Sequence, residues 1–202
     1  PPNLDLSGVA PLMCAGITIY SPLKNWNAGH GKKVGVMGLG GLGHMGLKFA
    51  HALGAETTVF SHSAAKEYDA KRMGADHFVV VTDSKDLKSL SKSFDLILNT
   101  VSADIDLDPY LQCLKLDGTL VVIGLPGKPY SINAGTLLDQ RRSLAGSMIG
   151  GIAQLQEMLN FCSTHNIVSD VEVIKPDYIN KAYERTVASD VKYRFVIDAK
   201  SF

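Results

Sequence analysis

Residues 33–43 read Lys-Val-Gly-Val-Met-Gly-Leu-Gly-Gly-Leu-Gly, a short apolar run followed by the pattern G-x-G-x-x-G. The run predicts a buried strand, and apolar residues that recur at helical spacing up to Leu53 predict an amphipathic helix after it. In such a unit Gly38 makes the tight turn, Gly40 lets the backbone approach a pyrophosphate, and Gly43 lets helix and strand pack closely. The context therefore favours a dinucleotide site over a glycine-rich turn in some other α/β protein.

Helices and strands alternate along the next hundred residues. Further strands are expected at 57–60, 77–81, 95–100, 119–123 and 143–149, with helical segments at 66–73, 84–92, 106–116 and 133–141. The strands are apolar throughout instead of alternating, which indicates a parallel sheet buried on both faces. We predict an α/β fold with a Rossmann-type, doubly wound, six-stranded parallel sheet. A helix over 11–26 precedes it, and Pro22 is expected to break or kink that helix.

The pattern changes after Gly151. A helix at 154–165, a strand at 171–174, a helix at 178–188 and a strand at 194–198 exceed what a six-stranded sheet needs. We predict a dinucleotide-binding domain over 1–151 and a second, incomplete unit over 152–202. The surplus strands either extend the sheet or belong to a domain whose remainder is absent.

Composition excludes several classes of protein. Lys plus Arg and Asp plus Glu both number 20, so the formal charge is zero and nothing favours nucleic acid or an anionic membrane as a partner. No apolar run approaches the length of a membrane span, and no signal peptide is evident. The three cysteines are widely spaced, which fits a reducing, cytoplasmic setting. The chain begins at Pro1, so we expect a piece of a longer protein.

The end of the second strand bears on the choice of nucleotide. NAD sites place an acidic residue there for the ribose hydroxyls, but here the sequence is Ser61-His62-Ser63, followed by Lys66. The serine hydroxyls can donate hydrogen bonds and the lysine adds positive charge, which suits the 2′-phosphate of NADP. The histidine could stack on adenine or add a proton-dependent charge. Ser63 also precedes a helix and could serve as its N-cap.

Three blocks, at 10–18, 38–46 and 193–198, together resemble the zinc-dependent medium-chain alcohol dehydrogenases, most closely the cinnamyl-alcohol-dehydrogenase-like branch. The resemblance implies NADP(H) as cofactor and a small alcohol or aldehyde as substrate. It implies Cys14 as one of three protein ligands of a catalytic zinc, whereas a buried core thiol is the alternative for a lone cysteine. The implied cofactor contacts are Thr18, Gly38, Leu39, Gly40, Gly41, Leu42, Gly43, Ser61, His62, Ser63, Lys66, Thr100, Gly124, Ser147, Met148 and Ile149.

The family also carries an upstream GroES-like catalytic domain with another zinc-ligand cysteine and a Gly-His-Glu segment, and neither is present in this chain. The six histidines offer no substitute ligand pattern, so we interpret them as surface or packing residues. In the intact enzyme zinc would act as a Lewis acid on the substrate oxygen. We expect this chain to bind NADP(H) without turnover. A zinc-free quinone or enone reductase of the same fold and a non-catalytic nucleotide-binding module stay open as alternatives.

Two further expectations rest on the resemblance. The chain's end would return to the missing domain, so part of 152–202 would lack support and expose apolar surface. Family members of this branch often pair their sixth strands across a two-fold axis, which predicts a homodimer through 143–149.

Overall fold

The computed structural model describes all 202 residues and contains the predicted six-stranded parallel sheet. Its strand order is β3-β2-β1-β4-β5-β6, the order of the dinucleotide-binding fold. The strands are β1 (Lys33–Met37), β2 (Glu56–Ser61), β3 (His77–Val80), β4 (Phe94–Asn99), β5 (Leu114–Val122) and β6 (Ser143–Gly146). The fold class predicted from the sequence is therefore confirmed.

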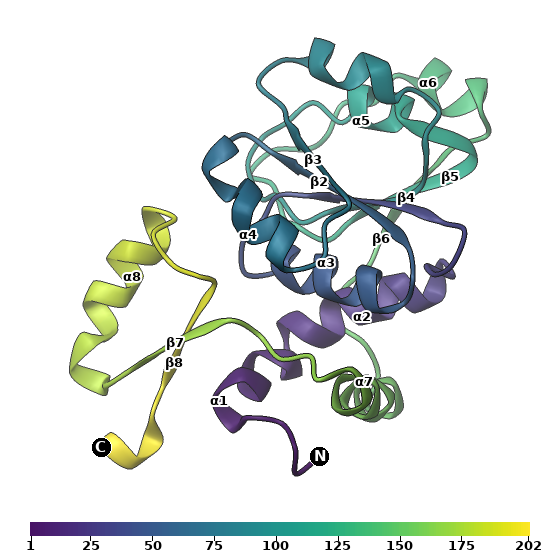
Figure 1. Cartoon of the computed structure of the whole chain (residues 1–202). Coiled ribbons are helices and arrows are strands. Elements are labelled where there is room, and N and C mark those ends of the chain that lie inside the picture. The colour runs from purple at the N-terminus through teal and green to yellow at the C-terminus, as the bar shows by residue number, and fades with distance from the viewer.

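Helices cover both faces of this sheet (Figure 1). One face packs against α2 (Ala15–Asn25), α3 (Gly43–Ala52) and α4 (Glu67–Arg72), and the other against a 3-10 helix (Ser84–Leu90), α5 (Asp108–Gln112) and α6 (Ala134–Asp139). Successive side chains of a strand point to opposite faces. Leu96 and Leu98 of β4 accordingly lie in the core beneath α2 and α3, whereas Ile97 lies in the core beneath α5.

The helix expected over 11–26 is in fact two pieces, so this prediction is wrong in detail. A short α1 (Leu6–Val9) leads into a 3-10 helix (Ala10–Met13), and α2 begins only after Cys14, whose φ of −125° and ψ of −72° are not helical. The chain does not break at Pro22. Helix α2 continues through it because its neighbours on the buried face, including Leu23, are held in the core.

Other boundaries also differ from expectation, some by several residues. The helix predicted over 106–116 ends at Gln112, and Leu114 already pairs with Phe94 in the sheet. A buried cation explains the difference, since the Arg142 guanidinium donates to the Leu114 carbonyl at 3.0 Å and holds that backbone in place. The strand predicted over 143–149 ends at Gly146, where its pairing with β5 stops.

The C-terminal segment does not extend the sheet. It forms α7 (Ile152–His165), β7 (Val171–Ile174), a 3-10 turn (Pro176–Tyr178), α8 (Ile179–Val187), β8 (Arg194–Ile197) and a last 3-10 turn (Ala199–Ser201). Strands β7 and β8 make a separate parallel pair, and α8 projects from them away from the sheet (Figure 1). Helix α7 instead packs on α2, and its Met158 and Cys162 are fully buried there.

Ion pairs and hydrogen bonds attach the β7–β8 pair to the main body. The Asp170 carboxylate just before β7 accepts hydrogen bonds from Lys48 of α3 and from Arg72 of α4. The Tyr193 hydroxyl just before β8 donates to Asp69 of α4 at 3.1 Å. Both strands of the pair are thus attached to the main body at their amino ends. Arg194, the first residue of β8, contacts the turn that follows β1.

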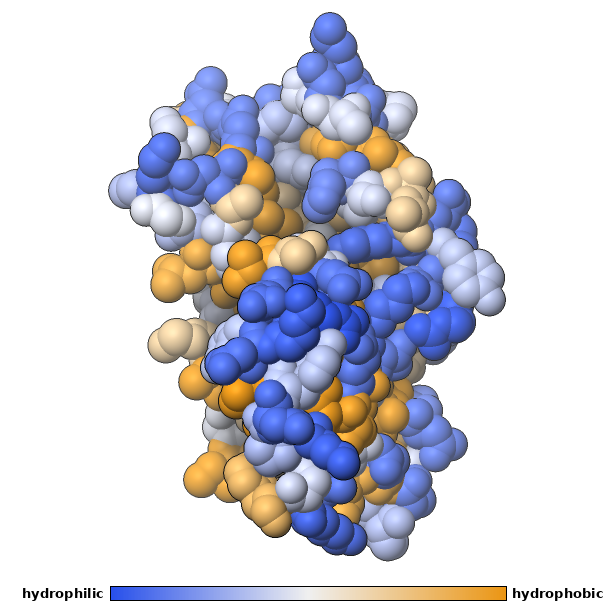
Figure 2. Space-filling model, turned by 90° about the vertical axis from the view of Figure 1, so that its left-hand side faces the viewer, coloured by the Kyte–Doolittle hydropathy of each residue, from blue (hydrophilic) through white to orange (hydrophobic).

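The far side of the C-terminal segment is mixed in polarity. Figure 2 views the molecule from the side of α8 and shows hydrophilic side chains across the centre of this face, with apolar ones beside and between them. Val173, Tyr183 and Val187 are exposed large apolar side chains of this segment. That it lacks support from a further domain stays a prediction.

None of the helices by itself has both the length and the apolar composition that a membrane span requires. The stretches Leu6–Met13 and Ala15–Asn25 meet the test of length and composition only when taken together, and they are bent by 59° at their junction.

Candidate cofactor-binding cleft

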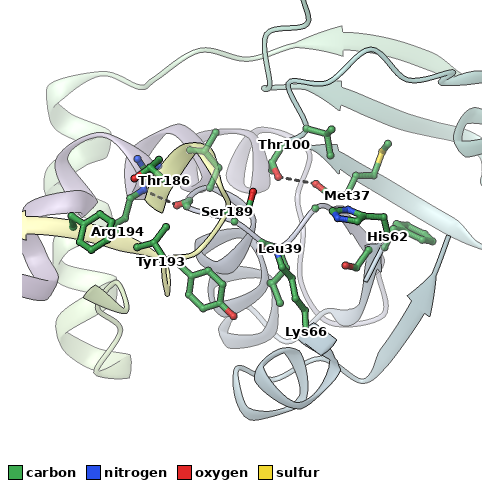
Figure 3. A pocket seen from close by; sticks show the side chains of 18 of the residues that line it. Met37, Leu39, His62, Lys66, Thr100, Thr186, Ser189, Tyr193 and Arg194 are labelled. Atoms are coloured by element: carbon green, nitrogen blue, oxygen red, sulfur yellow. Dashed lines mark hydrogen bonds between the residues drawn. The ribbon is translucent and has the colours of Figure 1, made fainter. Parts of the chain in front are cut away.

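A cleft of about 880 Å³ lies between the carboxyl edge of the sheet and the β7–β8–α8 lobe. Figure 3 shows its two walls, with Met37, Leu39 and Thr100 on the sheet side and Tyr193 and Arg194 on the C-terminal segment. Nine of the cofactor contacts predicted from the sequence line it: Gly38, Leu39, Gly40, Gly41, Leu42, Ser61, His62, Lys66 and Thr100. Because parallel strands end at one edge, residues distant in sequence converge there.

The glycine-rich turn has the geometry of an anion cradle. Gly38 takes a φ of +84°, which favours glycine, and its N–H donates to the Phe60 carbonyl at 2.9 Å. A Cβ on Gly43 would overlap the Gly38 carbonyl oxygen, so only glycine lets α3 begin this close to β1. The backbone N–H groups of residues 39–43 donate to no atom of the chain. Free N–H groups at the start of a ten-residue helix attract anions such as phosphate.

Two cationic side chains contact this turn, one from the segment after β2 and one from β8. Lys66 Nζ donates to the Leu39 carbonyl at 3.0 Å, and Arg194 Nε donates to the Gly41 carbonyl at 3.2 Å. Burial lowers the pKa of Lys66 and that of Arg194 from their ordinary values. The cleft therefore holds positive charge in a partly desolvated place, where an anionic ligand would gain more from it than in open water.

The end of β2 presents hydroxyl groups and no carboxylate. Ser61 Oγ accepts from the Ser63 N–H at 3.2 Å, which fixes the serine close to the cleft wall. Ser63 itself precedes the 3-10 helix Ala64–Lys66 but makes no side-chain cap, and it does not line the cleft. The His62 ring lies on the cleft wall near Met37 (Figure 3).

Several predicted contacts lie outside the cavity. Thr18 is buried on α2, and Met148 is 86% exposed beyond the end of β6. Gly124 follows β5 at the same edge of the sheet as the cleft, and a Cβ there would collide with the Val101 carbonyl. Cys14, the predicted zinc ligand, does not line the cavity. The predicted cofactor contacts that do not line it either are Thr18, Gly43, Ser63, Gly124, Ser147, Met148 and Ile149. Their part in cofactor binding stays a prediction.

Sequence reasoning missed the contribution of the C-terminal lobe to the cleft. Tyr193 and Arg194 lie in one of the three blocks that carry the family resemblance. An arginine inside an apolar strand pattern is a signal in itself, because burying an unpaired cation is costly. It also missed Asn99, a fully buried side chain at the end of β4. Its amide accepts from the Val101 N–H and donates to the Tyr130 hydroxyl, both at 3.0 Å, and so shapes the loop beside Thr100.

The residues present do not fit a zinc site. A catalytic zinc needs three protein ligands, and the structure brings no three His, Cys, Asp or Glu side chains close enough together to hold a metal ion. Cys14 is an exposed thiol at the start of α2, not a buried core thiol. It stands alone, so no chemical step can be assigned to a metal in this chain.

A family model for zinc-binding dehydrogenases matches residues 41–164, more than half of the chain. This chain belongs to the zinc-binding dehydrogenases. Curated relatives include NADP-dependent alcohol dehydrogenase C 1 of Mycolicibacterium smegmatis, 58% identical over 201 residues, and aldehyde reductase YahK of Escherichia coli, 54% identical over 201 residues. These matches cover 99–100% of the chain but only 58% of each relative, so the chain spans little more than half of their length.

Solved structures of this zinc-binding dehydrogenase family place the chain in the cinnamyl-alcohol-dehydrogenase-like branch. A cinnamyl alcohol dehydrogenase from Sorghum bicolor superposes with a TM-score of 0.95 at 44% identity, covering 98% of this chain and 57% of that one. The Helicobacter pylori enzyme of this type, solved with NADP(H), gives a TM-score of 0.89 at 42% identity and covers 99% of this chain and 57% of its own. The resemblance stated from the sequence is thereby confirmed.

Replacing Gly43 by alanine tests the close approach of α3 to β1. We expect Gly43→Ala to lower the free energy of unfolding by about 2–3 kcal/mol, because the new methyl group must push the Gly38 carbonyl away. Urea denaturation measures this. Gly40→Ala is the matched control, since a Cβ at Gly40 meets no atom within 4 Å. Equal stability of the two variants would contradict this account of the turn.

Proposed function

We propose that this chain is the NADP(H)-binding part of a zinc-dependent dehydrogenase that interconverts primary alcohols and aldehydes. The observation that carries the proposal is the pairing of an open phosphate cradle at residues 39–43 with Ser61 and Lys66 at the end of β2, in one cleft. The names of the relatives support it, since one is an NADP-dependent alcohol dehydrogenase and another an aldehyde reductase. Because those relatives are much longer, the reaction is proposed for the whole protein of which this chain forms a part.

The preference for NADP over NAD follows from charge. A carboxylate at the end of β2 would repel a 2′-phosphate, and none is present there. The Ser61 hydroxyl donates to the Ser63 carbonyl at 3.2 Å and can turn to donate to phosphate oxygens instead. The Lys66 ammonium can likewise move from the Leu39 carbonyl to pair with them. His62 on the same wall can stack on the adenine ring.

The chain's own residues bind and orient the cofactor. Hydride exchange between an alcohol and an aldehyde is the chemistry that a nicotinamide cofactor supplies when bound. The free N–H groups of residues 39–43 and the Arg194 guanidinium suit the pyrophosphate, which leaves the loop around Thr100 and Val101 for the nicotinamide half. Thr100 Oγ1 donates to the Met37 carbonyl at 2.7 Å, so this loop is fixed against β1. Apolar residues from both walls then exclude water from the cleft.

Calorimetric titration of the chain with NADPH and NADH tests the proposed cofactor. We expect tighter binding of NADPH, and Lys66→Ala should reduce that preference about tenfold because it removes a charge-assisted hydrogen bond to the 2′-phosphate. Lys85→Ala, an exposed lysine outside the cleft, is the matched control and should leave the preference unchanged. Equal affinity of the native chain for the two cofactors would contradict the assignment. Tighter binding of S-adenosylmethionine would favour a nucleotide-binding module of another class.

We also propose that the chain alone does not turn over, because Cys14 has no partner ligands within it. Purified chain supplied with NADPH, zinc and an aromatic aldehyde should show no loss of NADPH absorbance beyond the protein-free blank. Zinc-dependent aldehyde reduction would contradict this. Reduction of a quinone or enone without zinc would instead favour the zinc-free reductase of the same fold.

We further propose that the protein forms a homodimer through β6. This strand is at the edge of the sheet and pairs only with β5, which leaves its other side open for a second copy. Light scattering should give twice the chain mass, and Leu144→Pro should return the mass to that of one chain because proline cannot donate to an edge pairing. A monomer at micromolar concentration would contradict the proposal.

A further inference from the structure

His44 is a fully buried histidine in the first turn of α3, directly behind the glycine-rich turn. Both of its ring nitrogens have partners. Nδ1 lies 3.0 Å from the Gly40 carbonyl oxygen, and Nε2 lies 3.0 Å from Ser169 Oγ. The ring also stacks on Tyr193, with centroids 5.0 Å apart and planes 16° from parallel. The side chain does not line the cleft, so it acts on any ligand only through its neighbours.

The partners decide the protonation of the ring. A carbonyl oxygen can only accept, so Nδ1 carries the proton and donates it to Gly40. Nε2 is then the acceptor for the Ser169 hydroxyl, whose other contact, to the Asp170 carbonyl, is longer at 3.4 Å. Burial lowers the pKa of His44 to about 4, so the ring is neutral near pH 7 and keeps this tautomer.

The Gly40 carbonyl therefore accepts two hydrogen bonds, one from the His44 ring and one from the His44 backbone N–H at 3.0 Å. In a planar trans peptide the carbonyl and the following N–H point in opposite directions. Fixing the Gly40 oxygen toward α3 thus aims the Gly41 N–H away from the helix, toward the cleft that Gly41 lines. Glycine on both sides leaves this peptide free to rotate unless something holds it.

The C-terminal segment holds the other side of the His44 ring through Ser169 and Tyr193. The Ser169 N–H donates to the Gly8 carbonyl at 3.0 Å, which anchors that serine to α1, and the Tyr193 hydroxyl is anchored to Asp69. The orientation of one peptide in the phosphate cradle consequently depends on residues more than 120 positions further along the chain.

We propose that His44 is a positioning residue that holds the Gly40–Gly41 peptide with its N–H presented to the cofactor pyrophosphate, in the Nδ1-protonated form selected by Ser169. The proposal rests on the dinucleotide-binding function proposed above. It explains why a polar aromatic ring is buried at a position where an apolar side chain would suffice for packing.

Binding titrations of variants test the proposal. His44→Phe keeps the stacked ring but loses both hydrogen bonds, and it should weaken NADP+ and NAD+ about tenfold each, because both carry the same pyrophosphate. Adenosine 2′-phosphate, which has no pyrophosphate, should bind as it does to the native chain. His44→Asn places an amide N–H near the position of Nδ1 and should recover most of the lost affinity. His165→Phe, an exposed histidine on α7, is the matched control and should change nothing.

Nitrogen-15 NMR of the native chain should show one histidine in the Nδ1-protonated form, with a signal that His44→Asn removes. Unchanged NADP+ affinity in His44→Phe would overturn the proposal, as would equal weakening of adenosine 2′-phosphate or failure of His44→Asn to restore binding. If the native chain binds neither dinucleotide, the proposed function fails. If it binds them and His44→Phe binds them equally well, only the role of His44 fails.

Discussion

The contact between Gly43 and the Gly38 carbonyl is the constraint on which the rest of the site depends. It lets a helix start directly at the end of a central strand, so that the free N–H groups of residues 39–43 face one edge of the sheet. No other residue type can take the place of Gly43 without moving the turn. The sheet order β3-β2-β1-β4-β5-β6 then brings the ends of β2 and β4 to either side of that turn, which sets where a cofactor can lie.

The C-terminal segment gives this edge its second wall. Lys48, Arg72 and Asp69 on the main body hold Asp170 and Tyr193, and the strands they anchor carry Arg194 to the Gly41 carbonyl. The cleft is therefore not a property of the dinucleotide-binding fold alone. Its charge and shape come both from the turn after β1 and from a two-stranded pair that lies outside the main sheet.

Local patterns predicted the parts of the molecule that local chemistry controls. Glycine spacing, apolar strands and the polar residues after β2 were enough for the fold class and for eight residues of the cleft, whereas Thr100 was implied only by the family resemblance. Features that depend on distant contacts were not predictable in this way. The early start of β5 depends on a hydrogen bond from the buried Arg142, and the place of Arg194 depends on the β7–β8 pair, which brings it to the Gly41 carbonyl.

The position of Arg194 has a thermodynamic consequence. A ligand that touches both the glycine-rich turn and β8 binds only when the lobe is docked, so its binding energy adds to the free energy that keeps the lobe in place. By linkage, any change that lowers the docked fraction of the lobe lowers the apparent affinity of the ligand by the same factor, even when the change lies outside the cleft. Docking of the segment that holds β7, α8 and β8 and binding of a nucleotide in the cleft are therefore coupled equilibria, each of which favours the other.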